Sequence, residues 1–275
     1  MPELPEVETV ARGLAKILEG KTIEKALVRR PDLRLPFPKG LAAKLKGLRV
    51  LHIGRRAKYV LMHLSNDLVL LIHLGMSGRI LLGQGTVPTG KHAHFVLLMQ
   101  DGAWACLEDP RRFGCVDLLD ADSQDRHPLL AGLGPEPFDS KLDARFFMQR
   151  LARKKGPIKP ALMDQALIAG IGNIYASEAL YRARLSPERP CNSLTEQECE
   201  ALLQALRQVL EEAIASGGST LRDHVRPDGE LGYFQHHFAV YARQGDPCPR
   251  CKSKAKIQRI LQAGRSSFYC QRCQR

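Results

Sequence analysis

The sequence has no long apolar run. The stretch Leu68–Ile72 is as long as any of them, and a membrane-spanning helix needs roughly 20 apolar residues. The first residues also lack the positive charge of a secretory signal, because they carry Glu3, Glu6 and Glu8 instead. We therefore expect a cytoplasmic protein that has no membrane partner.

Acidic residues are scarce relative to basic ones. The chain has 275 residues, with 29 Asp or Glu against 41 Lys or Arg and a net charge of +12. Such a balance favours a polyanionic partner, because Lys and Arg release counterions when they neutralise phosphates. A basic protein without such a partner is the alternative. The length predicts two domains, or two domains and a small appendage.

Disulfide bonds are not expected in the reducing cytosol, although the chain has eight cysteines. Four of them are isolated and fit small core positions: Cys106, Cys115, Cys191 and Cys199. The other four form two CxxC pairs with 18 residues between the pairs: Cys248, Cys251, Cys270 and Cys273. This spacing predicts one structural zinc ion with no open coordination position. Redox-active dithiols are the alternative.

Hydrophobic periodicity divides the chain into a strand-rich part and a helical part. Residues 5–19 have the spacing of an amphipathic helix, with Val7, Val10, Leu14, Ile17 and Leu18 on the inward face. Short strand patterns then continue to about residue 119 and predict a sandwich or a barrel. The turn-rich residues 128–143 are the best boundary between the two parts.

Beyond that boundary the pattern becomes helical. One helix is expected from Asn173 to about Ala183. A second should begin with a capping box of Ser193 and Glu196. Its inward face is predicted to hold Cys199, Leu202, Leu206, Val209 and Ala213. Residues 243–275 form a third piece with nine Lys or Arg and one acid. In it, Ala263-Gly264 predicts a hairpin turn with Arg265 at the tip.

The N-terminal residues suggest nucleophilic chemistry. If Met1 is removed, Pro2 carries a free secondary amine, and α-amino groups are less basic than lysine. A secondary amine that attacks a sugar C1′ gives an iminium without an N–H to lose, so the cation stays and acidifies the C2′ proton. Glu3 could act as a general acid. The alternative is that acids simply favour the positive end of a helix.

Eight sequence blocks resemble the formamidopyrimidine-DNA glycosylase family, in order and over nearly the whole chain. They are Pro2-Glu-Leu-Pro-Glu-Val-Glu-Thr9, Arg55-Arg-Ala-Lys-Tyr59, His73-Leu-Gly-Met-Ser-Gly78, Asp109-Pro-Arg-Arg-Phe-Gly114, Leu133-Gly-Pro-Glu-Pro137 with Ile158-Lys-Pro160, Gly172-Asn-Ile-Tyr-Ala-Ser-Glu178, and Phe268-Tyr-Cys-x-x-Cys273.

The resemblance implies an α+β fold in three parts. Residues 1–132 would form a catalytic domain with an N-terminal helix and a β-sandwich. Residues 133–242 would form a helical domain with a helix–two-turn–helix motif, and residues 243–275 a zinc ribbon. Double-stranded DNA with a damaged base would lie in the cleft between them, bound by a monomer.

The resemblance also implies residue roles. Pro2 would be the Schiff-base nucleophile, Glu3 the proton donor to the sugar and Glu6 a second acid near the sugar. Lys58 would assist excision and β-elimination, and Arg265 would assist δ-elimination. The expected DNA contacts are His73, Met76, His92, Arg111, Phe113, Lys155 and Asn173.

Other residues have simpler interpretations. Lys58 should lie in a strand and share a face with Arg56, where a phosphate would relieve their repulsion. Arg153–Lys155 and Lys159 form a charge run, usually a solvated face, which their place beside the boundary assigns to the DNA cleft. Trp104 fits the core, and the pair His236-His237 has no role that the sequence assigns.

The sequence departs from the family pattern at two places. Lys252 replaces the glycine that usually follows the first CxxC pair, which puts the shape of that turn in doubt, and Ser266-Ser267 replaces a pair such as Ala-Thr.

Two alternatives to the oxidised-purine enzyme stay open. One is a non-enzymatic zinc-ribbon DNA-binding protein, and the other is the related glycosylase type that prefers oxidised pyrimidines.

Overall fold

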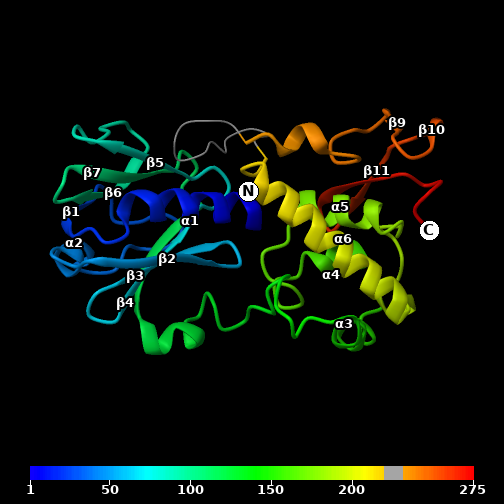
Figure 1. The fold of residues 1–275 in the computed structure, drawn as a ribbon, viewed down its shortest axis with the longest axis horizontal. Helices are drawn as coiled ribbons and strands as arrows, with labels where there is room; N and C mark the ends of the chain where they lie inside the picture. The colour runs from blue at the N-terminus through cyan, green and yellow to red at the C-terminus, as the bar shows by residue number, and fades with distance from the viewer. Residues whose placement is uncertain (220–231) are drawn as a thin grey trace. The chain divides into compact units, whose positions relative to one another are not determined.

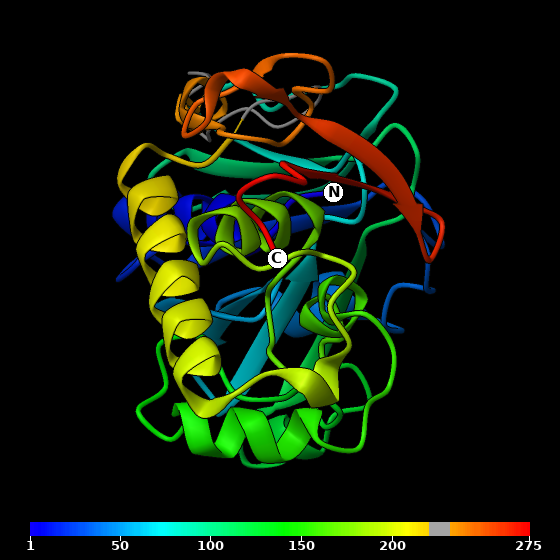
Figure 2. The ribbon, with the colours of Figure 1, turned by 90° about the vertical axis from the view of Figure 1, so that its right-hand side faces the viewer.

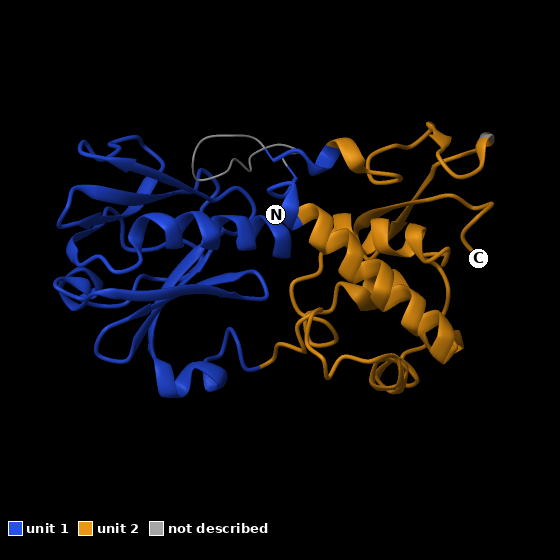
Figure 3. Ribbon diagram, in the orientation of Figure 1, with its two compact units in different colours: residues 1–131, 214–235 blue, residues 132–213, 236–275 orange. Residues whose placement is uncertain are grey.

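The computed structural model describes residues 1–219 and 232–275 and places them in two units (Figure 3). The first unit contains Met1–Ala131 and the described part of Ile214–Gln235, and the second contains Gly132–Ala213 and His236–Arg275. The division into three domains at residues 132 and 242 stays a prediction. No helix in the described residues has the length and apolar character needed to cross a membrane.

Two antiparallel four-stranded sheets make up most of the first unit, which confirms the predicted β-sandwich. One sheet has the strand order β1-β6-β7-β5 and the other the order β2-β3-β4-β8. The strand bounds are β1 Ile23–Val28, β2 Val50–Arg56, β3 Tyr59–Leu64, β4 Leu68–His73, β5 Arg79–Gln84, β6 Ala93–Met99, β7 Ala103–Glu108 and β8 Cys115–Asp120.

Helix α1 (Leu4–Leu18) runs between the two sheets (Figure 1). Its side chains Val7, Val10, Leu14 and Leu18 join one hydrophobic core with residues of both sheets. Ile17, predicted to face inward, is 37% exposed instead. It lies at the edge of the apolar stripe in the last turn, whereas Leu14 and Leu18 lie near its centre.

Helices dominate the second unit. They are α3 Ala144–Leu151, α4 Ile158–Leu162, α5 Asn173–Arg182 and α6 Glu196–Ala215, whose last two residues belong to the first unit. The predicted inward face of α6 is buried from Cys199 to Ala213. Its predicted capping box was wrong by two residues, because the reciprocal bonds join Thr195 and Glu198. Ser193 lies in a short 3-10 turn before the helix.

The C-terminal residues form two small β-ribbons. One ribbon pairs β9 (Pro247–Cys248) with β10 (Lys252–Lys256). The other pairs β11 (Gln258–Gln262) with β12 (Arg265–Tyr269) and is the longer hairpin seen in Figure 2. The remaining short helices are α2 Leu41–Leu45, η1 Ala121–Arg126, η2 Cys191–Ser193 and η3 Phe234–His237.

Candidate active site and metal centre

The start of α1 brings three predicted catalytic residues together. Pro2 is buried, and Glu3 and Glu6 are only 4% and 2% exposed. Glu3 is the N-cap residue, and its backbone N–H donates to Glu6 Oε2 at 2.8 Å. Glu6 therefore caps the helix through a hydrogen bond, which goes beyond the predicted alternative that acids favour the positive end of a helix. The same hydrogen bond fixes the backbone next to Pro2. A single interaction therefore caps the helix and positions Pro2.

Ser219 is a site residue that the sequence did not reveal. Its backbone N–H and its hydroxyl both donate to Glu6 Oε1 at 2.9 Å. The preceding Gly218 has φ +78°, and a Cβ there would lie 3.1 Å from Glu6 Cγ. The close approach thus requires glycine. The only signal nearby in the sequence is the pair Gly217-Gly218, which by itself indicates the end of a helix and not a contact with Glu6.

Lys58 lies in a turn and not in a strand as predicted. Strand β2 ends at Arg56 and β3 begins at Tyr59, so Ala57 and Lys58 are the two turn residues of a hairpin. Ala57 has φ +51°, which takes Lys58 off the strand face of Arg56. The Lys58 side chain is only 6% exposed. Its surroundings are therefore those of a buried lysine rather than of a solvated strand face.

His73 is next to Lys58 because of the strand register. Tyr59 pairs with His73, and their ring centroids lie 4.9 Å apart. Burial and then the charge of Lys58 lower the pKa of His73 to about 4. The imidazole is therefore neutral at pH 7. Its Nδ1 accepts the Gly75 N–H at 3.1 Å, so Nε2 carries the hydrogen and can donate to a ligand.

The loops of residues 74–78 and 109–114 expose the apolar residues that were predicted to contact DNA. Met76 is 40% exposed and Phe113 is 45% exposed, so neither is a core residue. The guanidinium of Arg111 lies 4.9 Å from the centroid of the Phe113 ring. His92 is also exposed, on the loop before β6. All four side chains could reach a ligand.

In the second unit, two lysines of the predicted charge run have different environments. Lys155 is exposed, in agreement with a contact to DNA. Lys159 is only 1% exposed, so its assignment to a solvated or DNA-facing surface was wrong. Its Nζ donates to Asn173 Oδ1 at 2.6 Å, to Ser266 O at 3.0 Å and to Ser267 Oγ at 2.8 Å. A buried ammonium needs such partners.

Asn173 is the first residue of α5 and contacts the same hairpin. Its Nδ2 donates to Ser266 O at 3.0 Å, which uses one of the two hydrogens on that nitrogen. Lys159 and Asn173 together therefore fix the start of β12 against α4 and α5. The residue that directly precedes Ser266 in this hairpin is Arg265.

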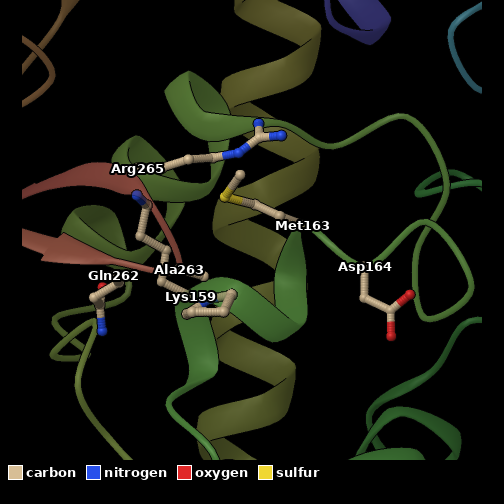
Figure 4. Close-up of a pocket in the computed structure, with 7 residues that line it drawn as sticks. Lys159, Met163, Asp164, Gln262, Ala263 and Arg265 are labelled. Atoms are coloured by element: carbon tan, nitrogen blue, oxygen red, sulfur yellow. The ribbon is translucent and has the colours of Figure 1, made fainter.

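Arg265 lies at the hairpin tip, as the sequence predicted. Ala263 and Gly264 both have positive φ, +46° and +72°, which is the geometry of a two-residue type I′ turn. Arg265 is exposed and borders a cavity of about 210 Å³. Figure 4 shows Arg265 and Gln262 coming from the hairpin, and Met163 and Asp164 from the end of α4.

The four paired cysteines converge. Their sulfur atoms all lie within 4.8 Å of one another, and the Cys248–Cys273 and Cys251–Cys270 separations are 3.8 Å. A tetrahedral zinc with bonds of about 2.3 Å places its sulfurs about 3.8 Å apart. The residues therefore fit one structural zinc ion. The Tyr181 hydroxyl lies 3.6 Å from Cys248 Sγ and ties this site to α5.

Family models match the chain in three segments. Residues 1–116 match the formamidopyrimidine-DNA glycosylase N-terminal domain, and residues 133–225 match the helix–two-turn–helix domain of that enzyme. The chain belongs to the formamidopyrimidine-DNA glycosylase family. Residues 245–275 match a zinc finger found in this family and in isoleucyl-tRNA synthetase. The resemblance that the sequence blocks indicated is thus confirmed over almost all of the chain.

Full-length relatives and solved structures agree with this membership. Formamidopyrimidine-DNA glycosylases of Gluconobacter oxydans and Rhodospirillum rubrum are 52% and 50% identical, with complete coverage of both chains. The crystal structure of the MutM (Fpg) protein from Thermus thermophilus has 42% identity, covers 99% of this chain and 98% of its own, and has a TM-score of 0.87. The Lactococcus lactis Fpg in complex with N7-benzyl-Fapy-dG DNA has 34% identity, complete coverage of both chains and a TM-score of 0.90.

Proposed function

We propose that this protein is a base-excision repair enzyme that removes oxidised purines, such as 8-oxoguanine and formamidopyrimidines, and then cleaves the DNA strand by β,δ-elimination. Relatives of about 50% identity over their full length are named for the glycosylase activity, and a related structure holds Fapy-dG DNA. The observation that carries the proposal is the buried group of Pro2, Glu3 and Glu6 at the start of α1.

The proposed chemistry begins with the amine of Pro2 after removal of Met1. Its nitrogen forms a bond to the sugar C1′ while the bond from C1′ to the base breaks, and the base leaves with a proton. Glu3 protonates the sugar ring oxygen as the ring opens, which gives the iminium. Loss of the C2′ proton then expels the 3′-phosphate, a step assisted by Lys58. Arg265 assists the second elimination, which expels the 5′-phosphate.

The remaining site residues are proposed to hold the DNA. Neutral His73, His92, Lys155 and Asn173 offer donors or charge to phosphates, and Met76, Arg111 and Phe113 fill the space that the extruded base leaves. The zinc ion holds the hairpin that carries Arg265. An enzyme that acts on chromosomal DNA works at the nucleoid, which supports the predicted cytoplasmic location.

The test is excision from an 8-oxoguanine·cytosine duplex, followed by borohydride trapping and mass spectrometry of the adduct. We expect both strand cleavage and a covalent adduct on Pro2 of a protein that lacks Met1. Glu3→Gln should still be trapped in part on a preformed abasic site, because base departure is then complete. Binding without excision, or preferred excision of oxidised pyrimidines, would favour one of the two alternatives. Reduced DNA attached to Lys58 would contradict the role of Pro2.

A further inference from the structure

The topology of the first unit places two crossover loops side by side. The loop of residues 74–78 leads from β4 to β5, and the loop of residues 109–114 leads from β7 to β8. Strand β4 pairs with β8, so that His73 faces Cys115, and β5 pairs with β7, so that Arg79 faces Glu108. Both loops therefore cross between the sheets at the same end.

The backbones of the two loops touch. Gly75 has φ +64°, and a Cβ there would lie 2.3 Å from the carbonyl carbon of Phe113. Gly114 is also tight, because a Cβ there would lie 2.7 Å from the carbonyl oxygen of His73. Only glycine permits this approach from both sides. The loops are thus packed together below their exposed tips.

A buried carboxylate joins the loops chemically. Asp109 is 0% exposed and Ser77 is 5% exposed. The Ser77 hydroxyl donates to Asp109 Oδ1 at 2.8 Å, and the Gly114 N–H donates to Asp109 Oδ2 at 2.8 Å. Ser77 Oγ in turn accepts the Arg111 N–H at 3.3 Å. The Asp109 carboxylate thus closes its own loop at Gly114 and holds Ser77 of the other loop.

We propose that the Asp109–Ser77 pair makes Met76, Arg111 and Phe113 act as a single wedge on DNA. This inference rests on the proposed function, because it gives these side chains a common task. Met76 is adjacent to Ser77, and Arg111 and Phe113 lie on the loop that Asp109 closes. Asp109 and Ser77 do not contact the DNA themselves. They are positioning residues that keep apolar side chains of both loops aimed at one gap.

A joint wedge makes a specific energetic prediction. When two side chains fill one gap on a common rigid support, the removal of one changes what the other contributes. The cost of Met76→Ala and the cost of Phe113→Ala should therefore not be independent. In a Ser77→Ala background the loops lose their hydrogen-bond link, and the two costs should become independent.

The experiment measures binding to a duplex with a stable abasic analogue, in which 2-aminopurine next to the gap reports on stacking. We expect the Kd of the double variant Met76→Ala, Phe113→Ala to differ by about fivefold from the value that two independent single effects would give. That factor should fall to about twofold or less when Ser77 is alanine. Ser123→Ala, whose hydroxyl donates to Asp120 O on the surface at 3.0 Å, is the matched control and should leave the factor unchanged.

Substitution of Asp109 gives a second test of the same coupling. Asp109→Asn keeps an acceptor for Gly114 N–H and a donor for Ser77 Oγ, so most of the coupling should return, whereas Asp109→Ala should lose it. Coupling that persists in Ser77→Ala would overturn the proposal, and so would its absence in the wild type. Because the readout is binding, a protein that shows the coupling but excises no 8-oxoguanine would contradict the proposed function and leave this inference standing.

Discussion

Ser219 donates two hydrogen bonds to one oxygen of Glu6, from a position 213 residues away in the sequence. The other oxygen of Glu6 accepts the N–H of Glu3. Three donors therefore converge on this carboxylate from two chain segments. The arrangement links the residue that follows the proposed nucleophile to the segment that follows α6.

Glu6→Gln should destabilise the protein, because an amide group places an NH2 against at least one of these donors. We expect the free energy of unfolding to fall by about 2 kcal/mol, the usual cost of disrupting a buried charged hydrogen bond. Urea denaturation measures it. Glu8→Gln is the control from the same helix, since Glu8 is only partly buried and pairs with Arg12 and Arg55. An equal loss for both variants would contradict this account.

The pKa of His73 predicts a pH-dependent stability. The folded-state pKa is about 4 against about 6.5 in the unfolded chain. The unfolded state therefore binds more protons between these values, and stability falls as the pH falls through this window. At pH 5 the loss relative to pH 8 should be about 2 kcal/mol.

The measurement compares the wild type with His73→Asn, whose side-chain oxygen can still accept the Gly75 N–H. Acid also releases zinc from thiolates, but this acts on both proteins and cancels in their difference. The wild type should lose more stability than the variant between pH 8 and pH 5. Parallel pH profiles for the two proteins would show that His73 is not the group responsible.

Local patterns predicted most of the fold. The helix that begins at residue 4, the inward face of α6 and the zinc cysteines all follow from periodicity or spacing, and each depends on residues close in the sequence. Ile17 was misplaced because periodicity gives the direction of a side chain and not the extent of the sheet that covers it.

The sequence could not predict contacts between distant segments. Lys159 was assigned to a charge run because its buried acceptors, Asn173 and Ser266, come from other elements. Ser219 was missed for the same reason. Lys58 was placed in a strand because no glycine, proline or asparagine marks the turn at Ala57. Only the family resemblance singled out Met76 and Phe113, since exposure of an apolar residue is not visible in a pattern.

Lys155 and Lys159 should respond differently to substitution, although both are lysines four positions apart. Lys155→Ala removes an exposed charge, so DNA binding should weaken and the slope of log K against log salt should fall by about one. Lys159→Met should leave that slope unchanged. Instead, the ratio of δ- to β-elimination products should fall by about tenfold, because loss of the Lys159 hydrogen bonds moves the hairpin that positions Arg265.

Salt titrations of binding and gel analysis of the cleavage products measure these two effects, and each variant is the control for the other. A lower salt slope for Lys159→Met would show that Lys159 contacts DNA phosphates after all. An unchanged product ratio would show that Arg265 does not depend on the contacts of Lys159 with Ser266 and Ser267.

Lys252 should be less favourable than the glycine it replaces. It has φ +54°, in the left-handed region, directly after the zinc ligand Cys251. A side chain there costs about 1 kcal/mol, which glycine avoids. Lys252→Gly should therefore stabilise the zinc-loaded protein and slow the transfer of zinc to a chromogenic chelator. Lys256→Gly, in strand β10 without a positive φ, should have the opposite effect, because glycine there only adds freedom to the unfolded chain. If Lys252→Gly released zinc as fast as the wild type or faster, the strain at this turn would not limit the stability of the site.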